Sequence, residues 1–150
     1  MKWNFTINYE KNEYKNFLLW KKIDLILEKT ISVLGIMFKG HFILNVVEQK
    51  TMQKINENYY PFKKISNILA FVLSKECFNT DFNNPLGEIY FCFPVIWKES
   101  GFCQKKFLQN SINLFLHSFL HLLGYDHKNK KEDELMNGLK RKILKEIKII

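Results

Sequence analysis

The feature that most constrains this fold is one long apolar stretch over residues 107–123. The stretch is too long for an ordinary strand, and Gly124 follows it in the position where glycine commonly ends helices. Residues 111–125 are the closest approach to a membrane span, but they fall short of the roughly 18 uncharged residues that a span needs. This segment also carries two histidines. The stretch therefore predicts a central helix of a soluble protein, with no membrane contact.

The remaining elements alternate around that helix. Period-two apolar patterns predict strands, and apolar residues at helical spacing predict helices that end at glycine or begin at proline. This order predicts an α+β fold, with one small mixed sheet of about four strands flanked by about five helices. The 150 residues are expected to form one domain over 1–150. The expected strands are 3–9, 41–47, 68–73 and 87–93, and the other helices are 17–34, 49–58, one from Pro94 and 130–147.

The charge and the cysteine content of the chain bear on its partners and its cellular compartment. The net charge of +8 is compatible with a polyanionic partner such as RNA. Every basic residue except Arg141 is lysine, however, and such a bias also fits a genome that favours lysine codons. Cys77, Cys92 and Cys103 form no CxxC pair, and no apolar signal sequence opens the chain. These observations favour reduced thiols and a cytoplasmic protein.

Three of the four histidines lie within eleven residues at the end of the central helix. His117 and His121 are four apart, which places both imidazoles on one helix face. A glycine at 124 lets the chain turn back, so that His127 can approach from a third direction. Three protein ligands with a fourth position open to water are typical of catalytic zinc, and we expect one Zn²⁺ per chain. Nickel, copper and iron also accept imidazole.

The residues beside these histidines narrow the chemistry. Zinc lowers the pKa of bound water towards 7 and so supplies hydroxide near neutral pH. Asp126 is a candidate acceptor for the second ring N–H of a ligand. Ser118 stands where helical zinc proteases carry the glutamate base, which disfavours peptide hydrolysis and favours a phosphodiester. The alternative is that these are ordinary core or surface histidines, but three at this spacing favour a metal site. The general acid and base remain unidentified.

At these residues the sequence resembles the YbeY family of rRNA maturation endoribonucleases. Residues 117–127 match the family signature His-Gly-x-Leu-His-Leu-x-Gly-Tyr-Asp-His, apart from Ser118 in place of glycine. Residues 86–89 resemble the family's Leu-Gly-Asp/Glu-Ile strand. Residues 55–59 and 66–69 resemble its Leu-Asn-x-x-Tyr and Thr-Asp/Asn-Val-Leu segments. The resemblance extends over roughly residues 40 to 147.

The resemblance implies a cytoplasmic, zinc-dependent endoribonuclease that cuts single-stranded RNA. It would act in maturation of the 16S rRNA 3′ end and in ribosome quality control. Its partners would be rRNA and the small ribosomal subunit, with no nucleotide cofactor. His117, His121 and His127 would be the metal ligands, at the mouth of a basic cleft in a small sheet flanked by helices.

One position departs from the family pattern. The family commonly has arginine where this chain has Tyr60, and tyrosine offers base stacking but no bidentate phosphate contact. Lys63 and Lys64 are candidate point charges that would compensate. The departure leaves a second hypothesis open, in which the chain is a weakened RNA- or ribosome-binding module that keeps the metal site. A third hypothesis is a hydrolase of peptides or small molecules, which the missing glutamate at Ser118 disfavours.

Overall fold

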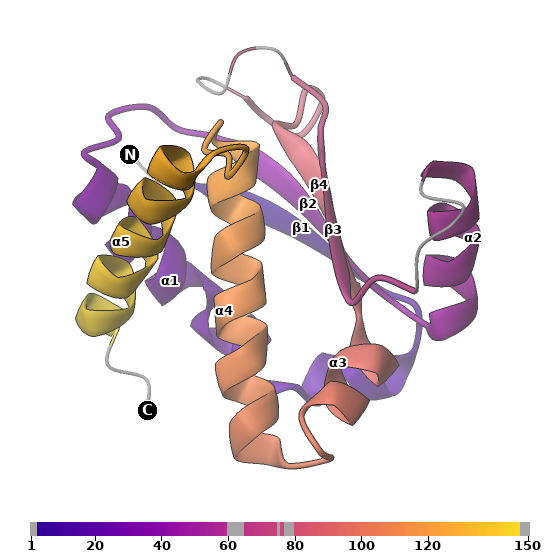
Figure 1. Cartoon of the computed structure of the whole chain (residues 1–150). Helices are drawn as coiled ribbons and strands as arrows, with labels where there is room; N and C mark the ends of the chain where they lie inside the picture. Colours follow the sequence, from indigo (N-terminus) through magenta and orange to yellow (C-terminus); the bar gives the residue numbers. More distant parts are fainter. Residues whose placement is uncertain (1–2, 60–64, 75, 77–79, 148–150) are drawn as a thin grey trace.

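A four-stranded mixed sheet organises the fold (Figure 1). The computed structural model describes residues 3–59, 65–74, 76 and 80–147. The strand order is β1-β2-β4-β3, in which β1 pairs with β2 and β2 with β4 in parallel, while β3 runs antiparallel to β4. The strands are β1 (Asn4–Tyr9), β2 (His41–Val47), β3 (Ile68–Val72) and β4 (Gly87–Cys92).

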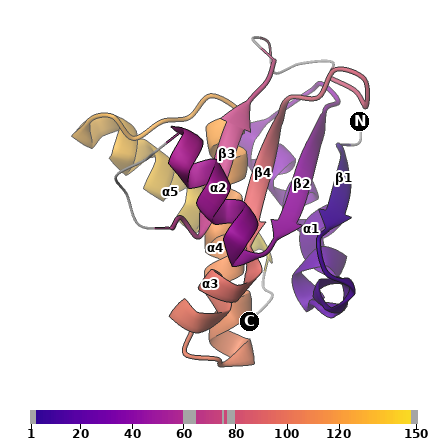
Figure 2. The same ribbon diagram turned by 90° about the vertical axis from the view of Figure 1, so that its right-hand side faces the viewer.

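The helices cover the two faces of the sheet unequally. Figure 2 shows α2 crossing the face that is turned to the viewer, with α1, α4 and α5 behind the sheet. The expected α+β class, with five helices and one four-stranded mixed sheet in the described residues, is confirmed. The helices are α1 (Leu18–Leu34), α2 (Gln49–Tyr59), α3 (Phe93–Glu99), α4 (Gln104–Leu122) and α5 (Lys130–Ile147), and a short 3-10 helix η1 spans Asn12–Asn16.

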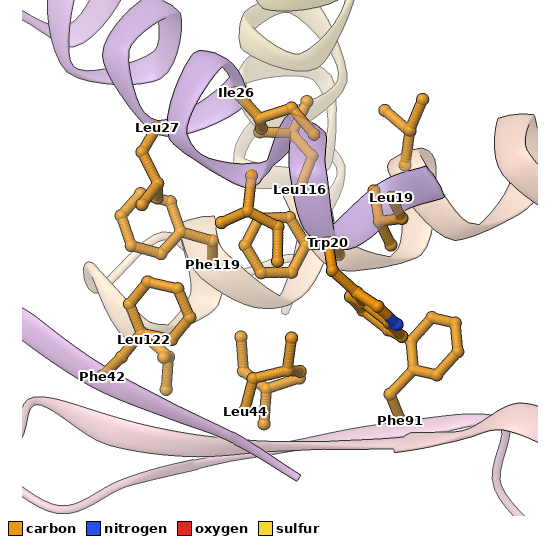
Figure 3. Close-up of a cluster of buried hydrophobic side chains, with 14 of the residues drawn as sticks. Leu19, Trp20, Ile26, Leu27, Phe42, Leu44, Phe91, Leu116, Phe119 and Leu122 are labelled. Atoms are coloured by element: carbon orange, nitrogen blue, oxygen red, sulfur yellow. The ribbon is translucent and has the colours of Figure 1, made fainter. Parts of the chain in front are cut away.

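The main core lies between the sheet and α1, α4 and α5. Alternate residues of β2 and β4, such as Phe42 and Phe91, are fully buried on this side. Figure 3 shows them packed against α1 and α4 side chains that include Leu116 and Phe119. Each large apolar side chain buried in this way contributes roughly 1.5–3 kcal/mol relative to an exposed one. The core therefore fixes α4 against the sheet, and with it the positions of the α4 histidines.

Several element boundaries differ from the sequence expectations by one to three residues. Helix α4 begins at Gln104 instead of residue 107, because its polar first turn carries no apolar periodicity. Strand β3 ends at Val72 instead of residue 73, and β4 ends at Cys92, because Phe93 already opens α3 ahead of Pro94. Helix η1 was not expected, since its residues are mostly polar and charged. Among the described helices, none is both long enough and apolar enough to cross a lipid bilayer.

Candidate metal centre

The last two turns of α4 carry two half-buried histidines. Leu116 and Leu120 on the same turns are fully buried in the core, which orients the helix. His117 and His121 are therefore held one turn apart and only partly covered. Ser118 is 4% exposed, so it belongs to the buried side and does not stand in for the glutamate base of a zinc protease. The structure thus presents both imidazoles from one rigid element.

Helix α4 ends in a Schellman motif, which redirects the chain towards these histidines. The Gly124 N–H donates to the His121 carbonyl at 3.0 Å, and the Tyr125 N–H donates to the Leu120 carbonyl at 3.1 Å. Gly124 has φ of +103°, a conformation that L side chains rarely adopt. The predicted role of Gly124 as the helix stop is confirmed.

The segment that contains His127 is anchored at its far end as well. The Asn129 Oδ1 accepts the Glu132 N–H at 2.9 Å, and the Glu132 Oε2 accepts the Lys128 N–H at 3.1 Å. These reciprocal bonds resemble a capping box at the start of α5. His127 therefore lies in a short connection whose two ends are both held by backbone hydrogen bonds, although its side chain is exposed.

The turn brings His127 back over α4. The ring centroids of His117 and His127 lie 5.2 Å apart, with the planes at 44°. Two imidazoles that bind one tetrahedral zinc at ~2.0–2.1 Å would have centroids about 5 Å apart, so this spacing fits a shared ion. His121 lies one turn after His117 on the same face of α4. All three imidazoles therefore belong to one local cluster.

The cluster is not a complete ligand set as placed. Within the described ranges of the chain, no group of three or more His, Cys, Asp or Glu side chains is close enough to hold a metal ion. The pair of His117 and His127 has the spacing for a common ion, and His121 would have to join it. The three-histidine ligand set and the identity of the metal stay predictions.

The electrostatics of the cluster suit a neutral ligand. Burial, first, and then the charges of Lys140, His127 and His121 lower the pKa of His117. A lowered pKa keeps this imidazole neutral near pH 7, which leaves a nitrogen lone pair for a metal. Lys140 was missed by the sequence reasoning. The signal was its spacing on α5, four residues after the buried Met136, which places it on the inward side of the helix.

The Asp126 carboxylate is engaged with the backbone. Its Oδ1 accepts the His127 N–H at 2.8 Å, and its Oδ2 lies 3.7 Å from the Lys128 Nζ. The hydrogen bond from the His127 N–H is the main cause that lowers the pKa of Asp126. In this arrangement Asp126 fixes the backbone that presents His127. Its expected contact with a ring N–H of a metal ligand stays a prediction.

The other candidate residues divide into two groups. Tyr60, Lys63 and Lys64, the expected substrate contacts, lie outside the described residues. Lys128, Lys130 and Lys131 are exposed directly after His127. Lysines at this place add positive charge beside the histidines, which would attract phosphate groups.

The histidine end of α4 also contacts the sheet closely. A Cβ at Gly87 would lie 2.6 Å from the Leu122 Cδ2 and 2.4 Å from the Phe71 carbonyl oxygen. No larger residue fits there unless the β3 backbone and the Leu122 side chain at the end of α4 both shift. The glycine in the Leu-Gly-Glu-Ile segment therefore serves to seat the histidine helix on the sheet.

Comparisons with known proteins bear on the family of the whole chain. Residues 4–148 match the family described as endoribonuclease YbeY. The endoribonuclease YbeY of Buchnera aphidicola subsp. Schizaphis graminum is 33% identical over 136 residues, covering 89% of this chain and 80% of that protein. The endoribonuclease YbeY of Ureaplasma parvum serovar 3 is 30% identical over 142 residues, covering 95% of this chain and 90% of that protein.

A solved structure supports the fold. The solution structure of TM1509 from Thermotoga maritima aligns with 95% of this chain and 88% of its own, with a TM-score of 0.64 and 22% sequence identity. The family match covers nearly the whole chain, and two relatives exceed or reach 30% identity over most of their length. The chain therefore belongs to the endoribonuclease YbeY family.

Proposed function

We propose that this chain is a zinc-dependent endoribonuclease that cuts single-stranded RNA, in the cytoplasm. Its task would be maturation of the 16S rRNA 3′ end and ribosome quality control, with rRNA of the small ribosomal subunit as substrate. The observation that carries the proposal is the histidine cluster at the end of α4, where the His117 and His127 rings lie 5.2 Å apart. The names of the relatives support RNA cleavage as the reaction.

The residues of this chain have distinct roles in the proposal. His117, His121 and His127 would hold the metal, and Asp126 would keep the His127 backbone in place through its 2.8 Å hydrogen bond. A bound zinc would supply Lewis-acid activation of water and of the phosphodiester. Lys128, together with the two lysines that open α5, would attract the RNA backbone as point charges.

The proposal is tested with an RNA that carries the 16S rRNA 3′ end, in single-stranded and duplex forms. The purified chain should cut the single-stranded form, lose this activity with a chelator and recover it with Zn²⁺. His121→Ala should be inactive, while His41→Gln, which also removes one histidine, should stay active. Cutting that survives both the chelator and His121→Ala would contradict the proposal.

A second candidate function is RNA or ribosome binding with weakened cleavage. It rests on Tyr60, which stands where the family commonly has arginine. In that case RNA binding should depend on salt and survive removal of the metal. Tyr60→Arg should raise the cleavage rate, and an unchanged rate would remove the argument from this position.

A further inference from the structure

A second concave site lies at the opposite end of α4. A cavity of about 480 Å³ opens where η1, the start of α1, α3 and the first turns of α4 meet. Helix α3 and the start of α4 lie in the lower part of Figure 1. The volume of the cavity falls in the range of roughly 300–1,000 Å³ that binding pockets occupy. Helix geometry places it about 15–25 Å from the two α4 histidines along the axis, at 1.5 Å per residue. The cavity is therefore separate from the candidate metal centre.

Four aromatic rings form one connected part of the wall. The Phe107 ring stacks on Phe17 with centroids 4.2 Å apart, and it meets Phe93 and Trp97 edge-on at 4.8 Å and 5.1 Å. Leu18 also lines the cavity, although 47% of its surface is exposed. The ring packing keeps the wall rigid while apolar surface remains open to solvent. Such a site suits a large apolar group.

The turn beside this wall adds a strained, exposed aromatic residue. Phe102 has φ of +56°, the left-handed region that normally favours glycine, and it directly follows Gly101 at φ +65°. A non-glycine residue pays roughly 1–2 kcal/mol there. Phe102 is 62% exposed, and its ring lies 5.9 Å from Trp97 at the cavity wall. Packing in the fold uses little of this side chain, so the strain points to contact with something outside the chain.

The charged residues around the cavity indicate which kind of partner would bind there. The first turn of α4 contains no acidic residue, yet it carries Lys105 and Lys106, both exposed. Their charges help to lower the pKa of the exposed Cys103 thiol, after the hydrogen bond from the Lys106 backbone, so this edge is electropositive. Glu13 supplies a negative charge on the other side of the opening. The carboxylates of an acidic partner could therefore form ion pairs with Lys105 and Lys106.

We propose that this cavity docks an acidic protein segment that inserts one large apolar side chain between Leu18 and Trp97. The apolar side chain would fill the cavity against the aromatic wall, and Phe102 would cover it. Acidic residues flanking it would pair with Lys105 and Lys106. A protein segment fits better than RNA because the wall is mainly apolar and, among its described lining residues, Lys105 is the one basic side chain available for a phosphate backbone. The docked segment would leave the histidine end of α4 free.

The test selects from a displayed library of random 12-residue peptides on the full-length protein. Selected peptides should share a large apolar residue flanked by Asp or Glu. Fluorescence anisotropy of a selected peptide should show affinity about tenfold or more weaker for Phe102→Gly and for Lys105→Glu. Lys54→Glu on α2, a charge reversal on the other side of the sheet, should bind as wild type. Phe102→Gly should melt no lower than wild type, since glycine accepts this backbone.

Three outcomes would overturn the proposal. One is selection of peptides without the acidic-apolar pattern, or equal binding to Phe102→Gly. The second is displacement of the bound peptide by a single-stranded RNA that binds wild type but not Phe102→Gly, which would identify a nucleic acid as the occupant. The third is concentration-dependent dimerisation that Phe102→Gly abolishes, which would identify a second copy of the chain.

Discussion

The two ends of α4 are built by different means. At the C-terminal end, His117, His121, Gly124 and His127 lie within one short stretch, and local hydrogen bonds form the turn. At the N-terminal end, the cavity is assembled from residues 13–18, 93–97 and 104–108, which are far apart in the sequence. The first end is thus encoded by a local motif, and the second exists only through tertiary packing. The predictions below test this difference from the largest expected effect to the smallest.

The N-terminal end should depend most on packing. Phe107 is 3% exposed and contacts Phe17, Phe93 and Trp97. Phe107→Ala should lower the free energy of unfolding by about 3–5 kcal/mol, because it deletes a buried aromatic ring and leaves a void. Urea unfolding monitored by circular dichroism measures this loss. A loss under 1 kcal/mol would show that the aromatic wall contributes little to the fold.

The C-terminal end should instead depend on the metal. At zinc concentrations of 100 to 1,000 times its Kd, the free energy of unfolding should rise by about 2.7–4.1 kcal/mol, because the metal binds the folded chain. Thermal melts with Zn²⁺ or with a chelator measure the effect. His121→Ala should show no such rise, and Phe107→Ala should keep it. Equal zinc stabilisation of wild type and His121→Ala would place the metal elsewhere.

The turn after α4 offers a matched pair of glycines. Gly35 ends α1 with φ of +66° and Gly124 ends α4 with φ of +103°, and neither would bring a Cβ within 4 Å of another residue. Alanine at either site should cost about 1–2 kcal/mol of stability through the backbone alone. Only Gly124→Ala should also weaken zinc binding, since only this turn presents His127. Zinc titration of both variants measures the Kd for zinc. An equal Kd for the two variants would show that the turn at Gly124 does not contribute to zinc binding.

The cap of α5 should have a smaller effect of the same kind. Asn129→Ala removes the acceptor for the Glu132 N–H and should cost about 1 kcal/mol of stability. Because the cap also anchors the segment with His127, zinc affinity should fall modestly as well. Asn113→Ala on the exposed side of α4 is the control, and its zinc affinity should match wild type. If Asn129→Ala binds zinc like this control, the α5 cap does not position His127.

The fourth histidine provides the smallest effect. His41 is buried, with its Nε2 2.9 Å from the Thr6 Oγ1, and burial lowers its pKa from 6.5 although Asp81 opposes the shift. The unfolded chain therefore binds a proton at His41 before the folded chain does. The free energy of unfolding should fall as the pH drops below about 6.5. His41→Gln should show a flatter decline between pH 7 and 5, and parallel curves would contradict a neutral buried His41.

These contrasts explain what the sequence could predict. The strand and helix order followed from apolar periodicity, and the end of the central helix followed from Gly124. The family followed from the signature over residues 117–127. The start of α4 at Gln104 was missed, since a polar first turn capped by Cys103 carries no periodic signal.

Features that need the assembled fold were not predictable. The spacing after Met136 places Lys140 on the inward side of α5, but its effect on His117 could not be predicted, because only the docking of α5 brings the two together. The aromatic cavity is formed by three segments that are far apart in the sequence, so no local sequence pattern predicts it. The positive φ of the exposed Phe102 could not be predicted either, because in the sequence it is an ordinary residue after a glycine. Sequence patterns thus pointed to the histidine cluster at the end of α4 but not to the cavity, and the metal itself stays a prediction.

The most direct test of the metal centre is zinc X-ray absorption spectroscopy on the zinc-loaded chain. Three histidine imidazoles at about 2.0–2.1 Å, with one further oxygen ligand, are predicted. Such a spectrum would show that His121 joins the His117 and His127 pair on one ion that keeps an open position. Sulfur scattering from a cysteine ligand, or fewer than three imidazoles, would contradict the central claim.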